Sequence, residues 1–153
     1  MAITIEAARP NAPEAVQLLS ELDAYLLEHP YPAESRHAFS IDKLLREGVA
    51  FFVARYEGKA AGCGGIKLFG TEYGEVKRMY VRPIHRGVGL GKAILDQLAA
   101  HARANQVKLL RLETGIYQTE AIGLYERYGF QRRGPFGEYK NDSNTVYFEK
   151  SIA

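Results

Sequence analysis

The sequence predicts an α/β (α+β) fold: a mixed, mostly antiparallel central sheet of six to seven strands with about four flanking helices. Two observations lead to this fold. Segments with strand character and segments with helical periodicity follow the order β-α-α-β-β-β-α-β-α-β-β along the chain. Three of the strands also follow one another with short turns between them, which is typical of antiparallel neighbours. Residues 1–153 are expected to form a single domain.

The first part of the chain predicts one strand and two helices. Ile3 to Ala8 alternates apolar and polar residues, as a half-buried strand does. Glu14 to Glu28 repeats apolar residues near helical spacing, and Pro30 ends this helix. A short helix from about Ser40 to Arg46 follows and ends at Gly48.

Three successive strands are predicted next. Ala50 to Tyr56 is rich in strand-forming residues and is followed by the turn Glu57-Gly58-Lys59. Ala60 to Phe69 contains three glycines, which indicate a bulge or a close approach of another backbone segment. Tyr73 to Val81 is the third strand, and Pro83 follows it. These segments predict an antiparallel meander.

The remaining segments alternate between helix and strand. Gly89 to Ala102 has apolar residues at four-residue spacing, which predicts a helix with one buried face. Val107 to Glu113 is a predicted strand, and Thr119 to Tyr128 is a predicted helix with an apolar stripe. Two strands close the chain, Phe130 to Arg133 and Thr145 to Lys150.

The composition limits the possible classes of function. Hydrophobic residues make up 46% of the chain and charged residues 25%, which is ordinary for a globular protein. The net charge of +2 is too small to indicate nucleic-acid binding. No apolar run is long enough to span a bilayer, and the N-terminal residues do not resemble a signal peptide. Cys63 is the only cysteine, so a reducing, cytoplasmic location is expected.

The segment Arg86-Gly-Val-Gly-Leu-Gly91 lies between a predicted strand and a predicted helix. Glycines let the backbone approach a ligand closely. The first N–H groups of the following helix have no partners within the helix, and the helix dipole favours an anion there. This segment therefore predicts a binding site for phosphate oxygens.

Two common phosphate-binding motifs do not fit this loop. The dinucleotide fingerprint G-x-G-x-x-G would place its third glycine at Lys92. A Walker A loop would require glycine at Arg86 and serine or threonine at Ala93. The pattern Arg-x-x-Gly-x-Gly, from Arg86 to Gly91, does fit. The alternative is a glycine-rich turn without a ligand.

This pattern resembles the phosphate loop of the GNAT acetyltransferases. The segment from Glu75 to Pro83 resembles the strand that precedes the loop in that family. A second block, Leu124-Tyr-Glu-Arg-Tyr-Gly-Phe130 with Ala121 before it, also resembles the family pattern. The order of elements agrees as well, so the resemblance covers nearly the whole chain. Gln118 stands where the family usually has asparagine.

A narrower resemblance concerns a bacterial subset of uncharacterised GNAT proteins. It is carried by four segments, Pro32 to His37, Gly62 to Gly64, Gly74 to Lys77 and Leu112 to Gly115. Some members of this subset are labelled indole-3-acetate acetyltransferase. A homodimer is compatible with the family resemblance.

The resemblance implies that acetyl-CoA is the co-substrate and that no metal is required. It implies that the strands Tyr73–Val81 and Val107–Glu113 separate at their C-terminal ends, where the pantetheine arm pairs with the free strand edge. The Met79 N–H is the expected donor to the thioester carbonyl. The implied cofactor-binding residues are Met79, Val81, Arg86, Gly87, Val88, Gly89, Gly91, Lys92 and Gln118.

The implied reaction is direct attack of a primary amine on the thioester. An alkyl ammonium group has a pKa near ~10, so a general base is useful. Glu75 is the first candidate and Glu113 is its rival; a strand-edge charge beside Lys77 is the structural alternative for Glu75. Tyr125 occupies the position of the family's proton donor to the CoA thiolate, and plain core packing is the alternative.

Three residues are candidates for binding the acceptor. Glu34 and His37 lie between the first two helices, a region that commonly forms one wall of the acceptor pocket in this fold; a helix capped by Ser35 is the equal alternative. Tyr139 lies in a later loop, where solvent-exposed turn residues are the alternative. The expected acceptor is an amino acid-like or polyamine-like small molecule, or a peptide. A CoA-binding sensor without turnover is the alternative function.

Overall fold

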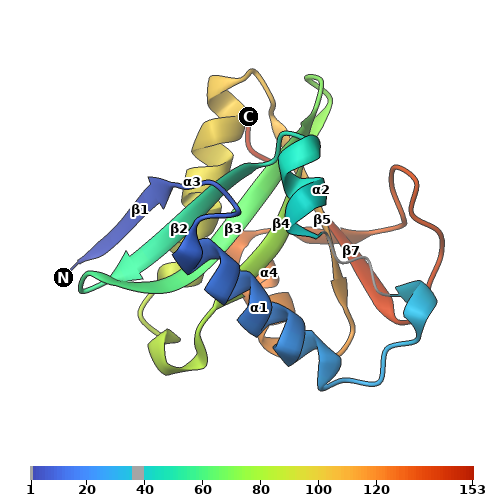
Figure 1. The fold of residues 1–153 in the computed structure, drawn as a ribbon. Coiled ribbons are helices and arrows are strands. Elements are labelled where there is room, and N and C mark those ends of the chain that lie inside the picture. Colours follow the sequence, from blue (N-terminus) through green and yellow to red (C-terminus); the bar gives the residue numbers. More distant parts are fainter. Residues whose placement is uncertain (1, 36–39) are drawn as a thin grey trace.

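A computed structural model describes residues 2–35 and 40–153. Seven strands form one sheet in the order β1-β2-β3-β4-β5-β7-β6 (Figure 1). The strands are β1 (Ile3–Ala7), β2 (Ala50–Tyr56), β3 (Lys59–Phe69), β4 (Tyr73–Val81), β5 (Leu109–Gly115), β6 (Gln131–Arg133) and β7 (Thr145–Ser151). The α-helices are α1 (Pro13–Leu27), α2 (Ile41–Arg46), α3 (Leu90–Ala104) and α4 (Thr119–Tyr128). Two short 3₁₀ helices lie at Ala33–Ser35 and Pro83–His85.

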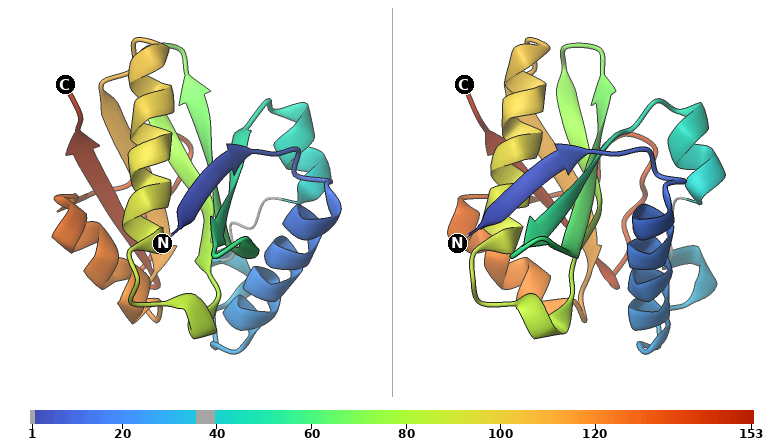
Figure 2. Two further views of the ribbon diagram at one scale, coloured as in Figure 1. Left: turned by 90° about the vertical axis from the view of Figure 1, so that its left-hand side faces the viewer. Right: turned by 60° about the vertical axis from the view of Figure 1, so that its left-hand side comes forward.

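The predicted fold class is confirmed. Every strand pair is antiparallel except β4 with β5, which is parallel. The helices cover both faces of the sheet: α1 and α2 lie on one face, and α3 and α4 lie on the other (Figure 2). One apolar cluster lies beneath α3 and α4 and another beneath α1 and α2, and a smaller one is formed by Tyr73, Phe136 and Tyr147.

Some element boundaries differ from the predicted ones for identifiable reasons. The third α-helix begins at Leu90 because Gly89, with φ of 94°, has a left-handed backbone and acts as the N-cap. Ser40 caps α2 by accepting a 3.1 Å hydrogen bond from the Lys43 N–H. Ser35 ends the first 3₁₀ helix, and the start of the alternative helix that Ser35 would cap lies outside the described residues.

A bulge in β4 changes which side chains face α1. Pairing between β3 and β4 shifts between Cys63 and Gly65, and Arg78 has a φ of 57°. As a result Lys77 and Arg78 both lie on the α1 side of the sheet, whereas Met79 packs into the cluster beneath α3. The glycines of β3 permit this arrangement, as the sequence indicated: a Cβ atom on Gly62 would lie 2.6 Å from the Tyr80 carbonyl oxygen.

The parallel strands β4 and β5 separate along their length. Only Gly74 with Leu110 and Glu75 with Arg111 are paired, both near the start of β4. Beyond these pairs the two strands diverge, as the family resemblance implied. Within residues 2–35 and 40–153, no helix is long and apolar enough to cross a membrane.

Candidate active site

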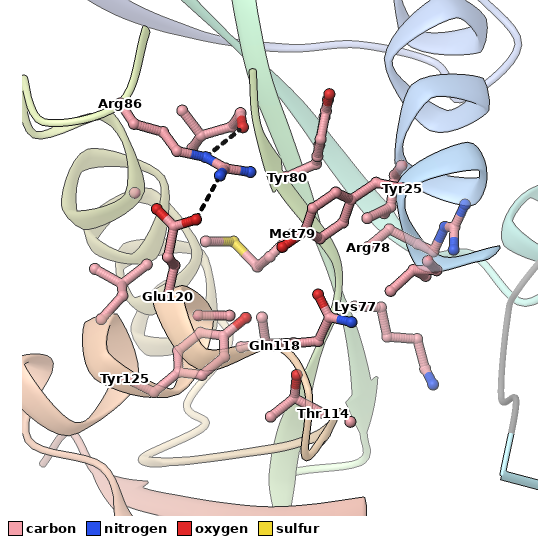
Figure 3. Close-up of a pocket in the computed structure, with 18 of the residues that line it drawn as sticks. Tyr25, Lys77, Arg78, Met79, Tyr80, Arg86, Thr114, Gln118, Glu120 and Tyr125 are labelled. Atoms are coloured by element: carbon pink, nitrogen blue, oxygen red, sulfur yellow. Dashed lines mark hydrogen bonds and ion pairs between the residues drawn. The ribbon is translucent and has the colours of Figure 1, made fainter. Parts of the chain in front are cut away.

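A cavity of about 1000 Å³ lies where β4 and β5 separate. Its walls come from α1, β4, the loop before α3, the start of α3, the end of β5 and α4 (Figure 3). Met79 and Val81 line it from β4, and Thr114 and Gly115 line it from β5. The cavity therefore runs from the glycine-rich loop through the gap between the strands to the face covered by α1.

The glycine-rich loop forms one end of the cavity. Gly87 and Gly89 have φ values of 88° and 94°, which side chains other than glycine rarely adopt. A Cβ atom on either residue would meet no atom within 4 Å, so the backbone here borders open space. This combination of exposed backbone and the start of α3 suits a phosphate group.

Gly91 has a separate structural reason to be glycine. A Cβ atom there would lie 2.7 Å from Cδ2 of Leu124, so Gly91 allows α3 to approach α4 closely. Gly91 still lines the cavity, together with Arg86, Gly87, Gly89 and Lys92. Val88 does not line the cavity, and its side chain points to solvent with 41% exposure.

Arg86 holds the loop in place through its side chain. Its Nε donates a 3.2 Å hydrogen bond to the Val81 carbonyl, and Nη1 lies 2.7 Å from Oε1 of Glu120 on α4 (Figure 3). The guanidinium also lies 5.5 Å from the centroid of the Tyr25 ring on α1. Arg86 thus joins β4, α4 and α1 at the loop end of the cavity.

Tyr125 lies on α4 and lines the cavity. Its ring packs against Phe130 and Phe148, and only 5% of the residue is exposed. The hydroxyl is directed toward the cavity (Figure 3), and it makes no hydrogen bond with the described residues. Burial, with a smaller effect of the Glu113 carboxylate, raises the pKa of Tyr125 above its usual range. The phenol therefore stays protonated and can donate a proton.

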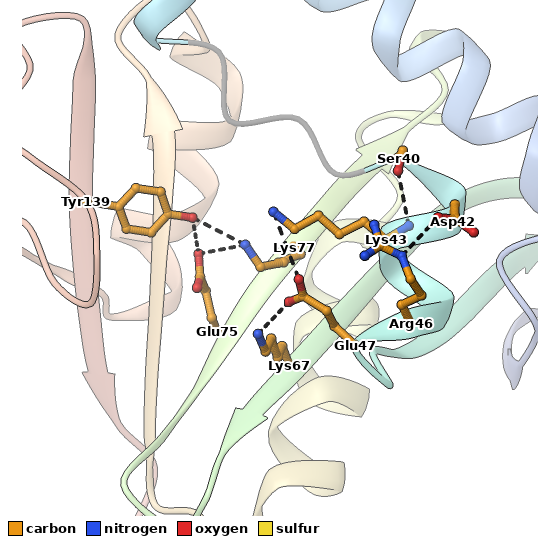
Figure 4. Close-up of polar contacts among 9 residues, drawn as sticks. All are labelled: Ser40, Asp42, Lys43, Arg46, Glu47, Lys67, Glu75, Lys77 and Tyr139. Carbon is orange, nitrogen blue, oxygen red and sulfur yellow. Dashed lines mark hydrogen bonds and ion pairs between the residues drawn. The ribbon is translucent and has the colours of Figure 1, made fainter.

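The two candidate glutamates occupy different places. Glu75 is 3% exposed, and its Oε2 accepts hydrogen bonds from Lys77 Nζ at 3.0 Å and from the Tyr139 hydroxyl at 2.6 Å (Figure 4). Glu75 is not among the residues that line the cavity, whereas Glu113 is. Glu75 pairs with Arg111 across β4 and β5, so Glu113, two residues further along β5, faces the same side beyond the point of separation.

The family model for "Acetyltransferase (GNAT) family" matches residues 15–130, which include β4, the loop, α3 and α4. The chain belongs to the GNAT family of acetyltransferases.

Individual relatives agree with this assignment. The chain is 43% identical over 152 residues to the "IAA acetyltransferase" of Azospirillum brasilense, covering 98% of each chain. It is 35% identical to the uncharacterised N-acetyltransferase YsnE of Bacillus subtilis, over 79% of this chain and 82% of that one. A crystal structure from Klebsiella pneumoniae, described as an acyl-CoA N-acyltransferase, matches with a TM-score of 0.83, 36% identity and coverage of 99% and 98%. The likeness to indole-3-acetate acetyltransferases is thereby confirmed.

In this GNAT chain the side chain of Gln118 is held by a tyrosine that sequence analysis missed. Gln118 is buried at the start of α4, and its Nε2 donates a 3.3 Å hydrogen bond to the Tyr31 hydroxyl. The same hydroxyl accepts a 2.8 Å hydrogen bond from the Tyr117 N–H. Tyr31 fits there because residue 115 is glycine: a Cβ atom on Gly115 would lie 2.1 Å from the hydroxyl oxygen. Tyr31 therefore joins the segment after α1 to the start of α4.

The residues expected to bind the acceptor are only partly brought together. Tyr139 contacts Glu75 and Lys77, and burial, followed by the charges of Glu113 and Glu75, raises the pKa of its hydroxyl far above the usual range. Tyr139 does not line the cavity itself. Glu34 lies in the first 3₁₀ helix and is not part of the wall, and His37 lies outside the described residues.

Two further residues lie on the α1 side of the sheet. Cys63 is buried beneath α1, and burial raises the pKa of its thiol to about 12, which is typical of a structural thiol. Arg78 lines the cavity on the α1 side, and the bulge that puts it there has no local sequence signal beyond the glycines of β3. Within the described residues, no group of three metal-binding side chains occurs.

Proposed function

We propose that this protein transfers the acetyl group of acetyl-CoA directly to the primary amine of a small molecule or peptide. One observation carries the proposal: the glycine-rich loop, the gap between β4 and β5 and the Tyr125 hydroxyl all border a single cavity. Each feature would serve a different part of the reaction. A glycine-rich turn that binds no ligand would not explain why the three features border the same cavity.

The residues present fit acetyl-CoA. The main chain of Gly87, Gly89, Gly91 and Lys92 would hold the pyrophosphate, because all four residues line the cavity at the start of α3. The main chain of Met79 and Val81 would pair with the pantetheine arm along the unpaired part of β4. When bound, acetyl-CoA supplies an acetyl group that is activated as a thioester.

The chain's own residues account for the proton movements. Glu113 borders the cavity and would accept the proton from the attacking amine, directly or through water. The Met79 N–H would stabilise negative charge on the carbonyl oxygen. The protonated Tyr125 hydroxyl would donate to the departing sulfur. Glu75, which is committed to Lys77 and Tyr139, would support the wall of the site instead.

Turnover on a broad amine panel tests the proposal. The purified protein would be incubated with acetyl-CoA and each amine, with thiol release followed by absorbance and the product by mass spectrometry. Thiol release matched by acetylated product supports the proposal. Acetyl-CoA binding without turnover, unchanged by Tyr125→Phe, would support a sensor. If the protein neither binds acetyl-CoA nor acetylates any amine, both functions are refuted.

A further inference from the structure

The bulge in β4 places two cations side by side on the α1 side of the gap. Lys77 and Arg78 are adjacent in sequence, yet both lie on this face because the strand adds one residue there. Both line the cavity, on the side of β4 opposite to α3 (Figure 3). In a regular strand, neighbouring side chains would point to opposite faces.

Arg78 is buried more deeply than its contacts explain. Its side chain is 6% exposed, and its φ of 57° is an unusual conformation for a bulky residue. Within the described residues, only Nη2 takes part in hydrogen bonds, at 2.6 Å to Asp23 Oδ1 and 3.4 Å to the Leu19 carbonyl. Nε is fully buried and has no hydrogen-bond partner among residues 2–35 and 40–153. A contact that only joined β4 to α1 would not require a second, unused donor.

We propose that the acetyl acceptor carries a carboxylate close to its amine, and that Arg78 together with Lys77 binds this carboxylate. The inference rests on the proposed function, and it narrows the acceptor to an amino acid-like compound. A carboxylate is planar and can accept hydrogen bonds from an arginine in pairs, which suits a guanidinium with unused donors.

The charges around the cavity separate the two ends of such an acceptor. Glu113 borders the cavity from β5, across the gap from Lys77 and Arg78 on β4. An amine directed toward Glu113 therefore leaves a neighbouring carboxylate to face the two cations. Glu75 accepts hydrogen bonds from Lys77 and Tyr139 (Figure 4). Asp23 is paired with Arg78. A polyamine would instead place a second cation beside Lys77 and Arg78, where like charges repel.

Matched acceptors test the inference in the wild-type protein. For each of several side chains, kcat/KM would be measured for the amino acid, its carboxamide and its decarboxylated amine; phenylalanine, phenylalaninamide and phenethylamine form one such set. Putrescine and spermidine would complete the panel. We expect the amino acid to exceed both neutral analogues by at least about tenfold, because the analogues leave buried donors without partners. The amine of the carboxamide is less basic than that of the amino acid, so a larger fraction of it is unprotonated. This difference alone would favour the carboxamide, so it cannot produce the expected preference for the amino acid.

Substitution of Arg78 shows whether this residue causes the preference. In Arg78→Met the ratio of kcat/KM between amino acid and amide should fall toward one, whereas general damage to the fold would lower both values and preserve the ratio. Arg132→Met is the matched control, because Arg132 is exposed, pairs with Glu126, lies over the Phe148 ring and does not line the cavity. If Arg78→Met does not fold, Lys77→Met provides the same comparison of ratios.

The outcomes distinguish this inference from the proposed function. If no amine is acetylated, the proposed function itself fails. If amines are acetylated but polyamines or neutral amines match the amino acids, the proposed function stands and the carboxylate inference is wrong. A preserved ratio in folded Arg78→Met and Lys77→Met would also overturn it.

Discussion

The Tyr139 hydroxyl donates a 2.6 Å hydrogen bond to Oε2 of Glu75, and this contact joins the loop before β7 to the first part of β4. Lys77 Nζ lies 3.0 Å from the same oxygen, and its side chain and that of Glu75 are 7% and 4% exposed. Glu75 is thus a buried, hydrogen-bonded partner of two side chains. Glu113 borders the cavity and is better placed to reach a substrate.

This difference predicts that the same substitution, Glu to Gln, lowers the catalytic rate at Glu113 and the stability at Glu75. Glu113→Gln should lower kcat on the order of a hundredfold, because it removes the proposed base. Glu75→Gln should reduce the free energy of unfolding by about 3 kcal/mol, because it removes the charge that compensates buried Lys77. Steady-state kinetics and urea unfolding of both variants check the prediction. A large loss of kcat in a stable Glu75→Gln protein, with active Glu113→Gln, would assign the base to Glu75.

The Tyr125→Phe variant should fold normally but should have a lower kcat. Its hydroxyl makes no hydrogen bond with the described residues, so removing it costs little stability, while the proton donor for the thiolate is lost. We expect kcat to fall on the order of a hundredfold, measured as thiol release at saturating acetyl-CoA.

Tyr128→Phe is the control for this substitution. Tyr128 lies on the same helix, but its hydroxyl donates to Asp96 at 2.7 Å and it does not line the cavity. It should retain activity close to that of the wild type. Equal activity of Tyr125→Phe and Tyr128→Phe would mean that Tyr125 is only a packing residue.

The contact between Tyr31 and Gly115 predicts a coupled effect on stability. Gly115→Ala places a Cβ atom 2.1 Å from the Tyr31 hydroxyl oxygen and 2.3 Å from Cζ, so the ring must move and lose its hydrogen bonds. We expect destabilisation of about 1–3 kcal/mol. In the background of Tyr31→Ala the same substitution should cost much less, because the clash is gone. Additive effects in a double-mutant cycle by urea unfolding would argue against the contact.

Cys63 predicts a loss of stability at alkaline pH. Burial raises the pKa of its thiol to about 12 in the folded protein, compared with about 8.5 in an unfolded chain. Above pH of about 8.5 the unfolded state therefore releases a proton that the folded state retains, so the free energy of unfolding falls with rising pH. The contribution approaches about 1.4 kcal/mol per pH unit until the folded thiol itself ionises.

Urea unfolding of wild type and Cys63→Ala between pH 7 and 10.5 isolates this contribution. The difference in unfolding free energy between the two proteins should be constant near pH 7 and should shrink or reverse as the pH rises. The buried tyrosines, whose pKa values are also raised, act in both proteins and cancel in the difference. Parallel pH profiles would show that the Cys63 thiol ionises equally in both states.

Local patterns in the sequence were sufficient for the fold and for one end of the site. The loop from Arg86 to Gly91 could be predicted because a phosphate-binding backbone requires glycine at particular positions, and these glycines are visible in the sequence. The helices and strands followed from periodicity, and their ends shifted by a few residues where a cap decided the boundary, as at Gly89.

The other end of the site depends on contacts between distant residues. Arg78 faces the cavity only because β4 bulges against β3, and Tyr31 reaches Gln118 only because Gly115 leaves room. The sequence alone could not show whether Glu75 or Glu113 borders the cavity, since both lie on neighbouring strands and only their tertiary contacts differ. Their difference lies in Tyr139, which is 64 residues from Glu75 along the chain.

The most direct test of the central claim is calorimetric titration of acetyl-CoA into the wild type, Gly89→Glu and Gly70→Glu. Gly89 and Gly70 both have positive φ values, 94° and 58°, and open space around the Cβ position, but Gly70 lies in the turn between β3 and β4. We predict that the wild type and Gly70→Glu bind acetyl-CoA and that folded Gly89→Glu does not, because its carboxylate occupies the proposed phosphate site. Equal binding by all three proteins, or binding by none, would contradict the assignment of the loop to the cofactor.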